Sequence, residues 1–165
     1  MRAYNRIELE KVARETGFIR DNLEKVIRLS NILEFLVSND SLKGKVVLKG
    51  GTAINLTVFD MPRLSVDIDL DYCCNSDKDT MMADRAVIGQ EILGHMQSNG
   101  YTIHPSSKNT HALDSWVFSY LNAGGNKDNI KIEINYMMRT HILEPRTRKT
   151  SIPFIDEVDV YALSP

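Results

Sequence analysis

The sequence lacks the features of a membrane-spanning or disulfide-stabilised protein. It has no apolar run of the about 18 residues that a transmembrane helix needs. Charged side chains interrupt positions 1–15, where a signal peptide would need an apolar run. Its two cysteines, Cys73 and Cys74, are adjacent, so they lack the spaced pairs of a zinc site. We therefore expect a cytoplasmic chain with reduced thiols and no membrane partner.

An excess of basic residues is also missing. The chain of 165 residues has 20 Lys and Arg against 22 Asp and Glu, a net charge of −2, which argues against a general nucleic-acid-coating protein. The charge is uneven, however, because positions 131–149 hold five Lys or Arg but only two acids. A basic strip beside an acidic centre would attract a polyanion. Residues 146–149 alone fit a solvated loop equally well.

Hydrophobic spacing predicts the order of the elements. Apolar residues recur every three to four positions on both sides of Gly17 in the first forty residues, and again over 79–98, so helices are expected there. The core contacts expected in the helix over 79–98 are Met82, Ala86, Ile92, Leu93 and Met96. A further short helix is expected over 53–59, and strands over 46–48, 66–72, 101–104, 115–121, 130–138 and 158–161. Residues 122–129 read as a turn.

This order predicts an α+β (or α/β) fold, a mixed twisted β-sheet with helices packed on it. An N-terminal helical segment, 1–43, would pack on a core formed by residues 44–165. The length suits one domain with a proper hydrophobic core and is short for two.

One predicted strand carries a row of carboxylates. Asp67, Asp69 and Asp71 alternate with apolar residues, so they share one face at intervals of roughly 6.5 Å. Like charges so placed repel unless a cation neutralises them, and Mg²⁺ prefers carboxylate oxygens. Two such ions clamp the attacking and leaving oxygens of an in-line displacement. Glu133 has the alternation needed to add a third carboxylate from a later strand.

The acidic strand has two other interpretations. A strand with one solvated face is the simpler one, although Asp is a poor strand former, and it is favoured for Asp71. An EF-hand loop would also place acids at positions 1, 3 and 5, but it needs Gly at position 6 and Glu at position 12. Tyr72 and Lys78 stand at those positions, which excludes a calcium loop.

A glycine turn precedes the acidic strand. Gly50, Gly51 and Thr52 follow a buried strand and precede a predicted helix. Two glycines let the backbone approach a ligand closely, and a helix N-terminus directs N–H groups at phosphate. The turn matches neither the Walker A nor the dinucleotide-binding glycine pattern. Alone it indicates a tight turn, but the acidic strand that follows makes it more specific.

Together these motifs resemble a known catalytic signature. The turn at 50–52, the pair Asp67 and Asp69, and the later Glu133 are similar to those of the DNA polymerase β-like nucleotidyltransferase superfamily. Segments 48–53 and 63–70 closely resemble the AbiEii/AbiGii toxin family. Its members are nucleotidyltransferases of bacterial toxin–antitoxin and phage-defence systems.

The resemblance implies a role for each matched residue. Asp67, Asp69 and Glu133 would bind Mg²⁺ or Mn²⁺, and Glu133 would also help to deprotonate the acceptor hydroxyl. The residues implied in nucleotide binding are Lys49, Gly50, Gly51, Thr52, Arg63 and Ser65. Lys49 has an equal alternative, since it could simply end a strand.

The function implied is Mg²⁺-dependent transfer of a nucleoside monophosphate from a nucleoside triphosphate to a hydroxyl. The acceptor would be RNA, tRNA included, or a protein, and an antitoxin is an expected partner. The alternative is a catalytically silent binding module with the same fold, which engages an antitoxin or another protein. Family members continue into a C-terminal helical region, which we expect residues 44–165 to lack.

Overall fold

The computed structural model describes residues 5–51, 53, 67–137, 144–150 and 157–163. The helices are α1 (Arg6–Thr16), α2 (Arg20–Ser38) and α4 (Lys78–Ser98). The strands are β1 (Val46–Lys49), β2 (Asp67–Tyr72), β3 (Thr102–Ile103), β4 (Lys108–Asn109), β5 (Leu113–Leu121), β6 (Lys127–Asn135), β7 (Arg146–Lys149) and β8 (Asp159–Ala162). No helix in these ranges is long and apolar enough to cross a membrane.

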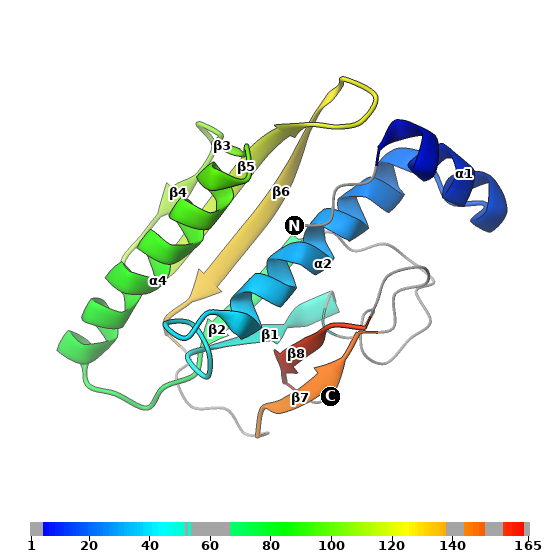
Figure 1. The fold of residues 1–165 in the computed structure, drawn as a ribbon. Coiled ribbons are helices and arrows are strands. Elements are labelled where there is room, and N and C mark those ends of the chain that lie inside the picture. The colour runs from blue at the N-terminus through cyan, green and yellow to red at the C-terminus, as the bar shows by residue number, and fades with distance from the viewer. Residues whose placement is uncertain (1–4, 52, 54–66, 138–143, 151–156, 164–165) are drawn as a thin grey trace.

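The strands form one mixed sheet with the acidic strand near its middle. The order is β3-β5-β6-β2-β1-β8-β7. The short strand β4 also pairs with β5, as β3 does. The β2–β6 and β1–β8 pairs are parallel and the other pairs are antiparallel. Helices α2 and α4 lie across one face of this sheet (Figure 1). The predicted α+β class, a mixed sheet with helices packed on it, is confirmed.

The N-terminal helices begin and end where local chemistry directs them. Asn5 caps α1 by accepting a hydrogen bond from the backbone of Glu8, whose carboxylate accepts one in return. Gly17 ends the helix in the left-handed region, at φ 74°. Leu9 of α1 is fully buried against Leu23 and Ile27 of α2. The break predicted at Gly17 is therefore confirmed, and a small satellite core holds the two helices together.

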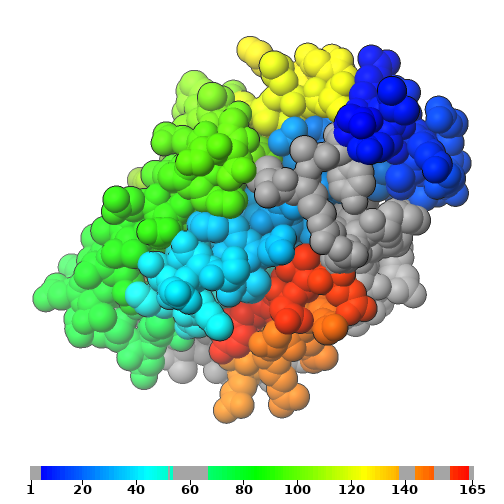
Figure 2. Space-filling model, viewed as in Figure 1, coloured from blue at the N-terminus to red at the C-terminus, as the bar shows by residue number. Residues whose placement is uncertain are grey.

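The main core fills the space between the helices and one sheet face. Apolar side chains of α2 and α4 pack against alternate residues of the central strands, among them Ile68, Leu70, Ile132 and Ile134. In the space-filling view, α2 and α4 form the surface in front of the central strands, whereas β7 and β8, in orange and red, stay visible (Figure 2). This burial on one face leaves the alternate residues of β2 and β6 on the opposite face.

The prediction of which α4 residues face the core is wrong for Met82 and Ala86. Met82 is 46% exposed and Ala86 is exposed, whereas Ile92 and Met96 are buried as predicted. Met81 is buried instead, and its spacing to the other buried residues of α4 keeps one helical face. Met82 and Ala86 lie on a neighbouring face, because each residue turns the helix by about 100°.

Two predicted loop segments are shorter or absent. Strand β6 begins at Lys127, so the turn expected over 122–129 is reduced to the residues between β5 and β6. Residues 146–149 form the edge strand β7, paired with β8, and all four are exposed. The helix expected over 53–59 lies outside the described residues except for Ala53.

Candidate active site

The predicted carboxylates lie on the sheet face opposite α2 and α4. Backbone pairing places Asp69 directly beside Glu133 on β6. On its other side Asp69 pairs with Lys49 of β1, and Asp67 pairs with Lys131. Residues directly opposite each other on neighbouring strands point to the same face. The fold therefore brings three predicted metal ligands and two lysines together on three adjacent strands.

Asp69 is the electrostatic centre of this group. Its pKa is raised above the usual value, first by partial burial and then by the negative charges of Glu133 and Asp67. Lys49 and Lys131 act in the opposite direction but do not cancel the effect. The carboxylates are thus close enough to repel one another, and a cation placed among them would relieve that repulsion.

Glu133 stays ionised in the same surroundings. Its partial burial favours the neutral acid, but hydrogen bonds from Lys131 and Ser115 outweigh burial and lower the pKa. The Lys131 Nζ lies 2.9 Å from Glu133 Oε2. An ionised carboxylate at this position is able to ligate a metal or to accept a proton.

Two features of the structure at position 50 favour glycine. Its φ of 73° lies in the left-handed region, and a Cβ added there would lie 3.0 Å from Oδ2 of Asp69. Gly50, Gly51 and Ala53 are helical, so a helix begins directly after β1 and beside the carboxylates. The structure thus brings the predicted glycine turn into contact with Asp69. Thr52, Arg63 and Ser65, the other predicted nucleotide-binding residues, lie outside the described residues.

Asp71 is not the solvated residue that was expected. Only 3% of it is exposed, and the Lys49 ammonium forms an ion pair with its carboxylate. Lys49 reaches it diagonally, because Asp71 pairs with Val47 on the same face of β1. The solvated-face interpretation of Asp71 is therefore wrong. A lysine at the end of the preceding strand was the signal in the sequence, but only the antiparallel register reveals the partner.

The oxygen donors present suit a hard divalent cation. Asp67, Asp69 and Glu133 supply the carboxylates that Mg²⁺ and Mn²⁺ prefer, and Gly50 leaves room above Asp69. Within the described ranges, no three His, Cys, Asp or Glu side chains are already gathered as a metal site. The donor set therefore fits by residue type and strand register, and the side chains would have to turn to converge on an ion.

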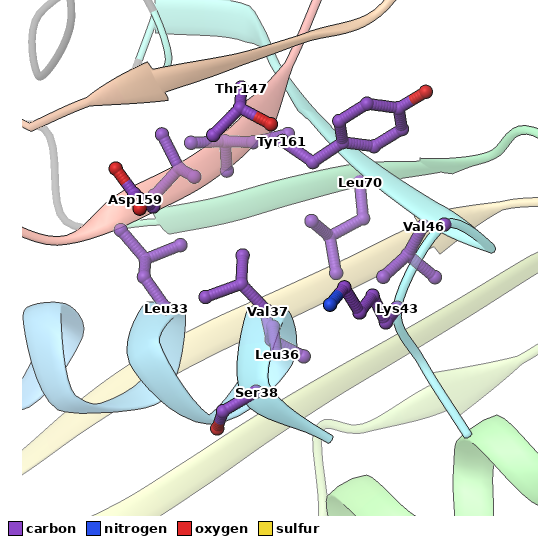
Figure 3. A pocket seen from close by; sticks show the side chains of 13 residues that line it. Leu33, Leu36, Val37, Ser38, Lys43, Val46, Leu70, Thr147, Asp159 and Tyr161 are labelled. Atoms are coloured by element: carbon purple, nitrogen blue, oxygen red, sulfur yellow. The ribbon is translucent and has the colours of Figure 1, made fainter. Parts of the chain in front are cut away.

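An apolar pocket among the described residues is a separate feature. It has a volume of about 570 Å³ and lies between the C-terminal part of α2 and strands β1 and β8 (Figure 3). Leu33, Leu36 and Val46 give it an apolar lining, and Lys43 reaches over it. Among the predicted site residues that the structure describes, none lines it. The candidate active site is the carboxylate face of the sheet, where the charged groups gather, and not this pocket.

Comparison with known proteins agrees with this arrangement. A family model described as "Nucleotidyl transferase AbiEii toxin, Type IV TA system" matches residues 32–165. No curated protein sequence matches the chain. The crystal structure of JHP933 from Helicobacter pylori is similar at 23% identity and a TM-score of 0.50, covering 77% of this chain and 48% of that one.

A second crystal structure from H. pylori, described as a "putative nucleotidyltransferase", has 22% identity and a TM-score of 0.50. It covers 85% of this chain and 52% of its own. The chain thus spans about half the length of these two structures, which are similar to it in fold. The family match extends over most of the chain and includes β1, β2 and β6. This chain belongs to the AbiEii family of nucleotidyl transferase toxins of type IV toxin–antitoxin systems.

Proposed function

We propose that this chain carries the catalytic site for transfer of a nucleoside monophosphate from a nucleoside triphosphate to a hydroxyl of RNA or protein. The observation that carries the proposal is the register of three strands, which sets Asp69 beside Glu133 and beneath Gly50. Membership of a nucleotidyl transferase toxin family supports the reaction class.

Asp67, Asp69 and Glu133 would hold Mg²⁺ or Mn²⁺. When bound, the metal supplies positive charge against the triphosphate and the leaving pyrophosphate. Gly50 and Gly51 begin a helix beside Asp69, so their backbone N–H groups are suited to donate to phosphate oxygens. Lys131 and Ser115 keep the pKa of Glu133 low, so its carboxylate is ionised and free to take the proton of the attacking hydroxyl, although the low pKa makes it a weak base.

The acceptor is proposed as RNA, with tRNA the first choice, or a protein hydroxyl. A polyanion agrees with the basic edge strand β7, whose residues include Arg146, Arg148 and Lys149. Three strand spacings separate β7 from β2, which corresponds to about 14 Å. An extended nucleic acid is long enough to contact both. In a cell, such a toxin would be opposed by an antitoxin.

The test is incubation of the purified chain with each labelled nucleoside triphosphate, Mg²⁺ and total tRNA or protein. Asp69→Asn should abolish label transfer, because it removes one of the metal-binding carboxylates. Asp40→Asn is the matched control, since Asp40 is an exposed turn residue that is not among the proposed site residues. Transfer by Asp69→Asn at the wild-type rate would refute the proposal. Antitoxin binding without Mg²⁺-dependent nucleotide binding would favour the silent binding module instead.

A further inference from the structure

Lys131 lies among the three carboxylates proposed as metal ligands. Its Nζ contacts Glu133 at 2.9 Å, and its backbone pairs with that of Asp67. The pKa of Lys131 is raised, first by the hydrogen bond to Glu133, which outweighs partial burial, and further by the negative charges of Glu133, Asp67 and Asp69. One ammonium therefore contacts Glu133 and lies on the same sheet face as Asp67 and Asp69.

This contact differs from an ordinary surface ion pair. Side-chain exposure is 38% for Lys131 and 27% for Glu133, so both groups are partly withdrawn from water. Three carboxylates on neighbouring strands repel one another, and each gains from a shared cation. The Lys131 side chain supplies that cation from within the chain.

A divalent ion would compete with Lys131 for the same oxygens. Mg²⁺ takes carboxylate oxygens at about 2.0–2.1 Å, and a lysine ammonium next to it would add repulsion between like charges. Glu133 has two oxygens, and Lys131 contacts Oε2. For Glu133 to turn towards a metal shared with Asp69, its contact with Lys131 has to weaken.

We propose that Lys131 is the resident counter-ion of the carboxylate site, that it is displaced from Glu133 when a divalent cation binds, and that it thereby sets the metal affinity. This inference rests on the proposed function, because it takes Asp67, Asp69 and Glu133 as the ligands. Lys131 is a positioning residue, which acts on the metal through Glu133.

The experiment measures Mn²⁺ binding to the full chain by titration calorimetry, without nucleotide. Lys131→Met should bind Mn²⁺ about fivefold to tenfold more tightly than wild type, since a like charge beside the cation is gone. Lys131→Arg should keep the wild-type affinity. Lys127→Met is the matched control, because Lys127 lies on the same face of β6 about 13 Å away and should leave the affinity unchanged.

Thermal unfolding of the same variants gives a second readout. Without metal, Lys131→Met should lower Tm, because three carboxylates lose their shared cation. Saturating Mn²⁺ should then raise its Tm by more than it raises that of wild type. Lys131→Gln serves as a second neutral variant if Lys131→Met does not fold.

Each outcome decides between the two proposals. Equal or weaker Mn²⁺ binding by both neutral variants overturns the role of Lys131. In that case the proposed function stands if wild type binds Mn²⁺ and Asp69→Asn does not. Absence of Mn²⁺ binding by wild type overturns both proposals.

Discussion

At the scale of single residues, Gly50 and Gly44 allow the effect of backbone strain on stability to be distinguished from an effect on the candidate active site. Gly50 and Gly44 have φ values of 73° and 74°, but only at Gly50 would a Cβ meet another side chain, Oδ2 of Asp69. Gly50→Ala and Gly44→Ala should each lose about 1–2 kcal/mol of unfolding free energy, the cost of a left-handed alanine. Only Gly50→Ala should also lose nucleotide transfer and Mn²⁺ binding.

Urea unfolding and Mn²⁺ titration of both variants would check this difference. Similar stability with unequal metal binding is the expected pattern. Equal metal binding by the two variants would contradict the close contact between Gly50 and Asp69.

Replacement of Lys49 should lower the free energy of unfolding more than replacement of Asp71, its ion-pair partner. The Asp71 side chain is 4% exposed and that of Lys49 31%, so Lys49→Met leaves a deeply buried carboxylate without its ammonium. We expect a loss of about 3 kcal/mol for Lys49→Met, since breaking a buried pair from one side is strongly destabilising. Asp71→Asn should lose less, and the double variant should recover part of the Lys49→Met loss. Chemical denaturation of the three variants measures the coupling.

For Lys49 and Asp71, the sequence predicted the face of the strand but not the burial or the ion pair. Period-two alternation correctly placed Asp67, Asp69 and Asp71 on one face, because strand geometry is local. It could not tell that Asp71 is buried while Asp67 is exposed, since that depends on which strands flank β2. The partner Lys49 is distant along the chain and is brought close only by the β1–β2 register.

At the scale of elements, Asp84 ties α4 to the sheet and should make stability depend on pH. It accepts hydrogen bonds from Lys45 at 2.7 Å and from the Tyr72 hydroxyl at 2.6 Å. Burial favours the neutral acid, but these two donors outweigh it and lower the pKa below 3.8. The stabilisation is therefore complete above the unfolded pKa and is lost as pH falls through the folded one.

Asp84→Asn should consequently be less stable than wild type near neutral pH, and the gap should narrow as pH falls below about 4 and through the folded pKa of Asp84. Urea unfolding at several pH values measures the gap, with Asp40→Asn as the exposed control. A gap that stays constant across this range would contradict an ionised Asp84 as the source of the stabilisation.

Elements were predicted well where hydrophobic periodicity is strong and poorly where it is weak. In β5, and in β6 from Ile130 onward, buried residues alternate with mostly half-buried ones, and both strands were expected. Strand β7 has four exposed polar residues, so nothing in its composition separates it from a loop. In α4, apolar residues lie on several faces, so spacing alone did not show that Met81 is buried and Met82 exposed.

At the scale of the whole molecule, the two faces of the sheet perform different tasks. Helices α2 and α4 cover one face of the sheet (Figure 1) and bury it in an apolar core. The other face gathers like charges at its centre. The core face contributes stability through burial of apolar surface. The carboxylate face reduces stability without a cation, and such trade-offs are common at functional sites.

One substitution on each face should therefore give opposite results. Ile92 is 1% exposed in α4, so Ile92→Ala should lose about 2–5 kcal/mol of stability through the cavity it leaves. Its folded fraction should still bind Mn²⁺ with the wild-type affinity, because the carboxylates lie on the far side of the sheet. Asp69→Asn should lose Mn²⁺ binding without losing stability.

The burial and neighbouring negative charges that raise the pKa of Asp69 disfavour its ionised form in the folded chain. A neutral Asn relieves that cost at neutral pH, so Tm without metal should rise. Thermal unfolding with and without Mn²⁺ tests both effects in one experiment. Wild type should gain Tm on addition of Mn²⁺ and Asp69→Asn should not, so that the order of the two curves reverses at saturating metal. A lower Tm for Asp69→Asn without metal would mean that Asp69 supports the fold, and the division of tasks between the faces would not hold.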